Sequence, residues 1–137
     1  MIQQRRALII ARPGPLREGL RAALGVMPCM DVAGEVDQAT LALRIRLDPA
    51  PALILLSAEN PGPGAVDAWQ QIRAHWPEAQ CIILADTVQQ QEEARAAGAD
   101  LVLLKGFAAA RLFVAVETLF GETGAGLGAG STSEEEE

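Results

Sequence analysis

The sequence predicts an α/β fold in three layers, a doubly wound parallel sheet of five strands with helices on both faces. Two observations predict it. Four short apolar runs and a shorter segment centred on Val32 and Ala33 end in turn-forming residues, and a stretch with helical character follows each of them. An apolar run without alternation suits a strand that is buried on both faces, as strands inside a parallel sheet are. Strands that alternate with helices across short loops give the (βα)5 pattern of such sheets.

The first part of the chain contains two predicted strands, each followed by a helix. Residues 7–10 form the first strand, and the helix after it is closed by Pro28. The apolar residues of this helix recur at helical spacing: Leu16, Leu20, Ala23, Leu24 and Met27. The second strand is expected over residues 30–36, and a second helix is expected to end before Pro49. That helix has a broad apolar side: Leu41, Leu43, Ile45 and Leu47.

The third strand is the centre of the predicted sheet. Residues 53–56 follow Pro51 and end in Ser57, after which comes a loop rich in proline and glycine. In open α/β sheets, functional groups usually lie just beyond the carboxyl ends of the strands, so Ser57 occupies a place where chemistry is expected. The helix that follows carries Val66, Trp69, Ile72 and Trp76 on one face. We expect both tryptophans to belong to the core and its rim.

Two further strands complete the sheet. Residues 81–84 form the fourth strand, after which Asp86 and Thr87 can cap a helix that ends at Gly98. Residues 101–104 form the fifth strand, which ends in Lys105. A last helix has an apolar side that consists of Leu112, Phe113, Val116, Leu119 and Phe120.

Composition limits the class of protein. A chain of 137 residues corresponds to about one domain and can bury a core. Half of the residues are hydrophobic but only 4% are aromatic, so we expect a core of Leu, Ile, Val and Ala. The net charge is −7, and residues 134–137 are all glutamate. Because binding to nucleic-acid phosphates needs clustered Lys and Arg, we expect no nucleic-acid binding by this chain.

Cysteine and histidine are few and scattered along the chain. Cys29 and Cys81 lack CxxC spacing, and the single His75 cannot complete a metal site with them, so we expect no metal or other cofactor. We expect Cys81 to be a buried strand residue and Cys29 a loop residue, both reduced, and His75 to be a solvated residue at a helix end. No apolar run is long enough to span a membrane, which predicts a cytoplasmic protein.

A change of composition near residue 121 predicts the domain boundary. A stretch rich in glycine, serine and threonine begins there and runs into the four terminal glutamates. Such a composition buries too little apolar surface to fold. We therefore expect one domain over residues 1–122 and a flexible acidic tail over residues 123–137.

Three segments resemble the receiver domain of bacterial two-component response regulators, in particular the class with a helix-turn-helix output domain. Residues 15–20 (PLREGL) resemble the start of that group's first helix, residues 32–35 (VAGE) its second strand, and residues 98–105 (GADLVLLK) its fifth strand with a terminal lysine. The resemblance covers about residues 6–122. It implies a flavodoxin-like sheet with the strand order 2-1-3-4-5, which agrees with the predicted pattern.

The family's chemistry uses an aspartate nucleophile, two acids that hold Mg²⁺, a hydroxyl and a lysine. By resemblance, the nucleophile position falls on Ser57, the acidic pair on Ala11 and Arg12, the hydroxyl on Ala85 and the lysine on Lys105. Only the lysine is retained, whereas the family's proline beyond the nucleophile is present as Pro61 and supports the alignment. A hydroxyl without an adjacent base is a poor nucleophile, and a guanidinium repels Mg²⁺. The resemblance therefore implies a degenerate receiver without Mg²⁺ and without aspartyl phosphorylation.

Two cations are expected at this edge of the sheet, Arg12 and Lys105. Either they pair with nearby acids, for which Glu59 and Asp86 are the candidates, or they form an anion pocket together with Ser57. We favour the internal ion pairs, because they need no ligand. We also favour Ser57 as a small residue that satisfies a loop amide over a phosphorylated serine.

The expected function is that of a pseudo-receiver in two-component signal transduction, which acts through protein contact. The expected interface lies on the first or fifth helix, or on the face of the fourth helix, fifth strand and fifth helix, and a homodimer through one of these is one form of it. The three phenylalanines lie on or next to the fifth helix: Phe107, Phe113 and Phe120. The alternatives are the regulatory half of a helix-turn-helix transcriptional regulator, and a flavodoxin-like module that binds a small anion or nucleotide. No enzyme is expected, because His75 lies away from Ser57 by topology.

Overall fold

The computed structural model describes residues 5–27, 30–37, 39–47, 50–57, 65–106 and 109–120. The chain divides into two compact units, residues 1–106 and residues 107–137, which are described separately. All five strands and the first four helices belong to the first unit. The predicted boundary at residue 122 remains a prediction, because the tail lies outside the described residues.

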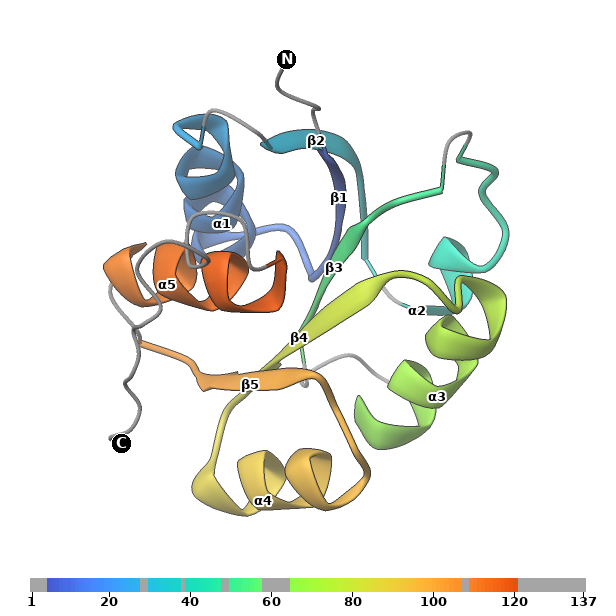
Figure 1. The fold of residues 1–137 in the computed structure, drawn as a ribbon, viewed down its shortest axis with the longest axis vertical. Helices are drawn as coiled ribbons and strands as arrows, with labels where there is room; N and C mark the ends of the chain where they lie inside the picture. The colour runs from blue at the N-terminus through green and yellow to red at the C-terminus, as the bar shows by residue number, and fades with distance from the viewer. Residues whose placement is uncertain are drawn as a thin grey trace. The chain divides into compact units, whose positions relative to one another are not determined.

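The first unit is built on a parallel sheet of five strands in the order β2-β1-β3-β4-β5 (Figure 1). The strands are β1 (Arg5–Ile10), β2 (Met30–Val36), β3 (Leu53–Ser57), β4 (Gln80–Ala85) and β5 (Leu101–Leu104). Every residue of β3 is buried, as the unbroken apolar run predicted for a central strand. The predicted fold class and strand order are confirmed.

Four helices cover the two faces of this sheet. They are α1 (Pro15–Gly25), α2 (Ala39–Ala42), α3 (Ala65–His75) and α4 (Val88–Ala96). Figure 1 shows α1 on one face and the other three helices on the opposite face. The strands contribute alternate residues to the two faces, so the first unit has the three layers that the sequence predicted.

The core on the side of α3 contains both tryptophans. Trp69 and Trp76 are 6% and 8% exposed and belong to one cluster with alternate residues of the strands. The strand residues of this cluster are Leu8, Ile10, Ile54, Leu56, Cys81, Ile83, Ala85 and Val102. Complete burial of each large aliphatic side chain contributes about 1.5–3 kcal/mol. The predicted core role of the tryptophans is confirmed, and His75 is exposed as expected.

Cys81 is a buried, unoxidised thiol near the start of β4. Burial, together with the negative charge of Asp100, raises the pKa of Cys81 above its ordinary range. The thiol is therefore protonated and unreactive at neutral pH, as the sequence predicted for a strand residue. Cys29 lies outside the described residues.

The second predicted helix is wrong over most of its length. The structure has a helix only at Ala39–Ala42, followed by turns and irregular backbone over residues 43–47. Its apolar residues are spaced two apart, which is not the period of a helix. Leu43, Ile45 and Leu47 pack against the core, while Arg44 and Arg46 between them are exposed. Because apolar and charged residues alternate, an irregular segment can turn its apolar side chains toward the core without forming a helix.

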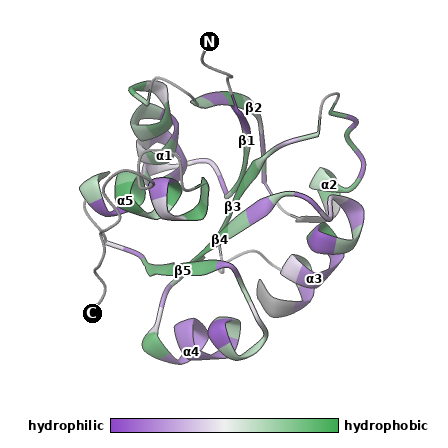
Figure 2. Ribbon diagram, in the orientation of Figure 1, coloured by the Kyte–Doolittle hydropathy of each residue, from purple (hydrophilic) through white to green (hydrophobic). Residues whose placement is uncertain are grey.

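The described part of the second unit is one helix, α5 (Ala109–Phe120). Its buried side chains are Leu112, Ala115 and Val116, and Val114 is 61% exposed. Phe113, Leu119 and Phe120 are half-buried, whereas Phe107 lies outside the described residues. Figure 2 shows the apolar character of the strands and of α5 against the polar α4. Within the described ranges, no helix has the length and hydropathy of a membrane span.

Candidate functional site

The candidate site lies where the parallel strands end at one edge of the sheet. Ile10 of β1 pairs with Leu56 of β3, Ser57 pairs with Leu84, and Ala85 of β4 pairs with Leu104. The predicted site positions continue these strands or directly follow them. The structure therefore gathers Ala11, Ser57, Ala85 and Lys105 at the same edge, as the topology predicted.

Ser57 is the last residue of β3 and is 0% exposed. Its neighbour across the ladder is the equally buried Leu84. Ser57 is not without a partner in the fold, so it is a satisfied buried polar residue rather than an open nucleophile. Asp and Glu are lacking at the described end of this strand, where the resemblance places the acceptor of the phosphoryl group.

Ala11 and Arg12 follow β1, where the resemblance places the family's acidic pair. Ala11 is buried, and its N–H donates to the carbonyl of Val36 at 2.9 Å, which ties the end of β1 to the end of β2. Arg12 is exposed. No ion pair joins Arg12 to another described residue, and its predicted partner Glu59 is outside the described part, so that pairing remains a prediction. A methyl group and a guanidinium are not ligands for Mg²⁺.

The sequence left two options for Lys105, an internal ion pair or a place in an anion pocket. The structure shows an ion pair with Asp86. Nζ of Lys105 lies 2.9 Å from Oδ1 of Asp86, and the backbone N–H of Lys105 donates to the carbonyl of Ala85 at 2.8 Å. Only 16% of the Lys105 side chain is exposed, against 39% for Asp86. The ammonium is thus bound internally at the point where β4 leads into α4.

Asp86 is itself held by the start of α4. Thr87 is the N-cap of this helix, and its Oγ1 accepts a hydrogen bond from the N–H of Gln90 at 3.1 Å. Oε1 of Gln90 in turn accepts from the N–H of Asp86 at 2.7 Å. This reciprocal arrangement resembles a capping box. The difference is that Gln90 accepts from the N–H of Asp86, the residue before the N-cap, and not from that of Thr87. Thr87 is thus confirmed as the predicted cap, whereas the carboxylate of Asp86 pairs with Lys105.

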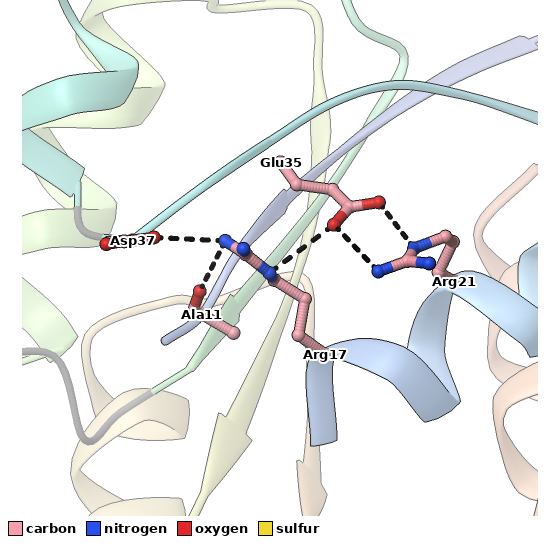
Figure 3. Close-up of polar contacts among 5 residues, drawn as sticks. All are labelled: Ala11, Arg17, Arg21, Glu35 and Asp37. Atoms are coloured by element: carbon pink, nitrogen blue, oxygen red, sulfur yellow. Dashed lines mark hydrogen bonds and ion pairs between the residues drawn. The ribbon is translucent and has the colours of Figure 1, made fainter. Parts of the chain in front are cut away.

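A second polar cluster at this edge was not predicted (Figure 3). Nη1 of Arg17 donates to the carbonyl of Ala11 at 3.2 Å and to Oδ1 of Asp37 at 3.0 Å, and its Nε lies 3.3 Å from Oε1 of Glu35. Nε of Arg21 lies 2.8 Å from Oε2 of the same glutamate. The guanidinium of Arg17 therefore joins α1 to the ends of β1 and β2.

One sequence signal could have indicated part of this cluster. Arg17 and Arg21 are four residues apart and so lie on the same face of α1. Their acidic partners are 14 to 20 residues away in sequence. Contacts of this kind depend on how β2 returns beside β1, which local sequence patterns do not contain.

The charges at this edge are largely compensated within the fold. Lys105 has Asp86, and Arg17 shares Glu35 and Asp37 with Arg21. Within the described ranges, no three His, Cys, Asp or Glu residues are arranged to hold a metal ion. The described edge therefore offers an internally paired polar surface, with the buried hydroxyl of Ser57 at the end of β3.

Comparison with known proteins gives structural neighbours only. The sequence matches no family model and no curated protein. A two-component response regulator of the LuxR family from Aurantimonas sp. SI85-9A1 is 26% identical, with a TM-score of 0.75 over 87% of each chain. The signal receiver domain of the response regulator NarL from Mycobacterium tuberculosis is 24% identical, with a TM-score of 0.73 over 88% of this chain and 99% of that one.

A third neighbour is the response regulator RcsB from Salmonella typhimurium. It is 17% identical, with a TM-score of 0.78 over 88% of this chain and 62% of that one. These neighbours cover 87–88% of this chain, and its strand order is 2-1-3-4-5. The chain has the flavodoxin-like fold of response-regulator receiver domains.

Proposed function

We propose that this chain is a pseudo-receiver, a signalling domain of two-component systems that acts through protein contacts without being phosphorylated on aspartate. The observation that carries the proposal is Ser57, fully buried at the end of β3 where a receiver presents its acceptor. Ala11 and Arg12 support it, because neither side chain can ligate Mg²⁺. The pairing of Lys105 with Asp86 supports it too, since this lysine already has a carboxylate partner.

The test is intact mass spectrometry after incubation with acetyl phosphate and Mg²⁺. A receiver domain with an intact acidic site, treated in the same way, is the positive control. We expect no added phosphoryl group on this chain. An acid-labile acyl phosphate would refute the proposal, and an acid-stable adduct that disappears in Ser57→Ala would replace it with a serine switch.

The output of a pseudo-receiver is expected to be contact with a protein partner or with a second copy. Large apolar side chains are exposed at several places that receivers use for contacts: Val26 after α1, Val88 in α4, Leu104 in β5 and Val114 in α5. The structural neighbour RcsB forms dimers that bind DNA. Light scattering after size-exclusion chromatography, with and without Val26→Asp or Val114→Asp, decides whether self-association is the output.

The alternative functions have less support. Membership in a longer helix-turn-helix regulator would keep the same receiver role, with DNA binding carried by another part of that protein. An anion pocket of Arg12, Ser57 and Lys105 is disfavoured, because Ser57 is fully buried and Nζ of Lys105 is shielded from solvent. Catalysis is not expected, because His75 lies at the far end of α3 from the candidate site. The proposed signalling role implies a protein that acts in the cytoplasm.

A further inference from the structure

We propose that the ion pair between Lys105 and Asp86 is a latch that holds the first turn of α4 against the end of β5, and that breaking it releases α4. This inference goes beyond the proposed function and does not depend on it, since the latch exists whatever the chemistry of Ser57. Four observations lead to it: the weak burial of α4, its fixed amino-terminal end, its separate carboxyl-terminal anchor and the exposure of Asp86.

The helix α4 is held by little apolar contact. Among its nine residues, only the side chain of Ala94 is buried, and Val88 is 56% exposed. Figure 2 shows that the rest of the helix is mostly polar. A helix this short does not persist in water on its own, because packing supplies most of the stability of helices in proteins. The position of α4 therefore depends on how its two ends are attached.

The amino-terminal end is attached through Asp86. The capping hydrogen bonds between Asp86, Thr87 and Gln90 make the loop and the first turn of α4 one unit. The carboxylate of Asp86 joins this unit to Nζ of Lys105. Lys105 is held by the sheet, because its N–H donates to the carbonyl of Ala85. The ion pair thus connects the end of the sheet with a helix that buries only one of its side chains, Ala94.

The carboxyl-terminal end of α4 is attached in a different way. Ala94 belongs to the core cluster, and the N–H of Ala99 donates to the carbonyl of Ala94 at 3.1 Å. Gly98 has a positive φ of 91°, which terminates the helix at no steric cost for a glycine. This end does not involve the ion pair, so loss of the latch frees the first turns of α4 while the end near Gly98 stays in place.

The two charges of the latch differ in their exposure to solvent. Nζ of Lys105 is shielded, whereas the side chain of Asp86 is 39% exposed. A competing charge from outside therefore reaches the carboxylate first, and it has to be a cation. Exposed Val88 follows Asp86 closely, and exposed Leu104 precedes Lys105. A partner that opens the latch would thus present an Arg or Lys side chain next to apolar residues.

The test is hydrogen–deuterium exchange of the full chain, read on peptides that cover α4 and, as an internal reference, α3. We expect Lys105→Met and Asp86→Asn each to accelerate exchange in residues 88–93 roughly threefold to tenfold, as the loss of a partly buried ion pair predicts, with no change in α3. The double variant is expected to exchange no faster than the faster single variant, because both changes remove the same interaction. Lys105→Arg is expected to retain slow exchange.

Glu92→Gln is the matched control, because it removes an exposed carboxylate from the same helix without touching the latch. If a variant does not fold, the salt dependence of exchange in the unmodified chain provides a second test. In 1 M NaCl, its α4 amides are expected to accelerate relative to those of the fully buried strand β3, because salt screens a pair with one exposed partner. Unchanged α4 exchange in both single variants, or equal acceleration of α3 and α4, would overturn the latch, as would salt-independent exchange.

Discussion

Replacement of Arg17 by methionine is expected to loosen the junction of α1, β1 and β2 at the candidate site. Methionine keeps most of the length of the side chain and removes the guanidinium. The change deletes the hydrogen bond to the carbonyl of Ala11 and the ion pairs with Glu35 and Asp37. Arg21→Met is the matched control, since Arg21 lies one turn away on the same helix and is paired with Glu35 alone.

The magnitude follows from the burial of these groups. The hydrogen bond to the carbonyl of Ala11 is long, at 3.2 Å, and we therefore assign it the ordinary contribution of about 0.5–1.5 kcal/mol. Each ion pair contributes about 0.2–1 kcal/mol, with Glu35 toward the upper end because only 20% of its side chain is exposed. We therefore expect Arg17→Met to lower the free energy of unfolding by about 1–3 kcal/mol. For Arg21→Met, whose side chain is 54% exposed, we expect a loss of about 0.2–1 kcal/mol.

The assay is urea unfolding followed by the fluorescence of the buried Trp69 and Trp76. The double variant is expected to lose more than the two single losses combined, because Glu35 then keeps neither of its two arginine partners. Equal losses for the two single variants would refute the reasoning, since they would show that the contacts to Ala11 and Asp37 contribute nothing. A loss below about 0.5 kcal/mol for Arg17→Met would do the same.

Three further predictions concern Asp100, Cys81 and the anion pocket. Asp100→Ala is expected to cost about 1–3 kcal/mol in urea unfolding, because the N–H of Cys81 then loses its acceptor at 3.0 Å. Asp100→Asn keeps an acceptor oxygen and is expected to cost less, so an equal loss in both variants would contradict the role of this hydrogen bond. The raised pKa of Cys81 means that the unfolded chain releases the thiol proton first as pH rises. Stability is therefore expected to be insensitive to this group below about pH 8 and to fall above about pH 9, by up to about 1.4 kcal/mol per pH unit, and Cys81→Ala is expected to remove that dependence. Phosphate and sulfate are expected to leave the melting temperature unchanged, and a concentration-dependent rise that Lys105→Met abolishes would restore the anion pocket.

Much of the fold was predictable from local patterns. The apolar runs at residues 53–56 and 81–84 predicted central strands, because only strands covered on both faces tolerate such runs. Thr87 and Gly98 predicted the ends of α4, because capping and positive φ are properties of single residues and their near neighbours. The prediction failed at α2, where the apolar residues from Leu41 to Leu47 alternate and the backbone beyond Ala42 is not helical.

The candidate site was predictable in its positions but only partly in its contacts. Topology placed Ser57, Ala85 and Lys105 at one edge, since parallel strands end together. It also made Asp86 a candidate partner for Lys105, and the structure pairs the two. It did not indicate Arg17, although this residue holds the ends of β1 and β2 together.

The sequence by itself determined the class of fold, the order of its elements and the lack of Asp and Glu at residues 11, 12 and 57, because these follow from residue type and from spacing along the chain. Only the tertiary structure decided which charges are compensated and which are accessible. That Arg17 reaches Asp37, and that Lys105 is shielded while Asp86 is exposed, depends on groups brought together from distant parts of the chain. Burial and ion pairing depend on all the groups that surround a side chain in the folded protein, and no single segment of the sequence specifies them.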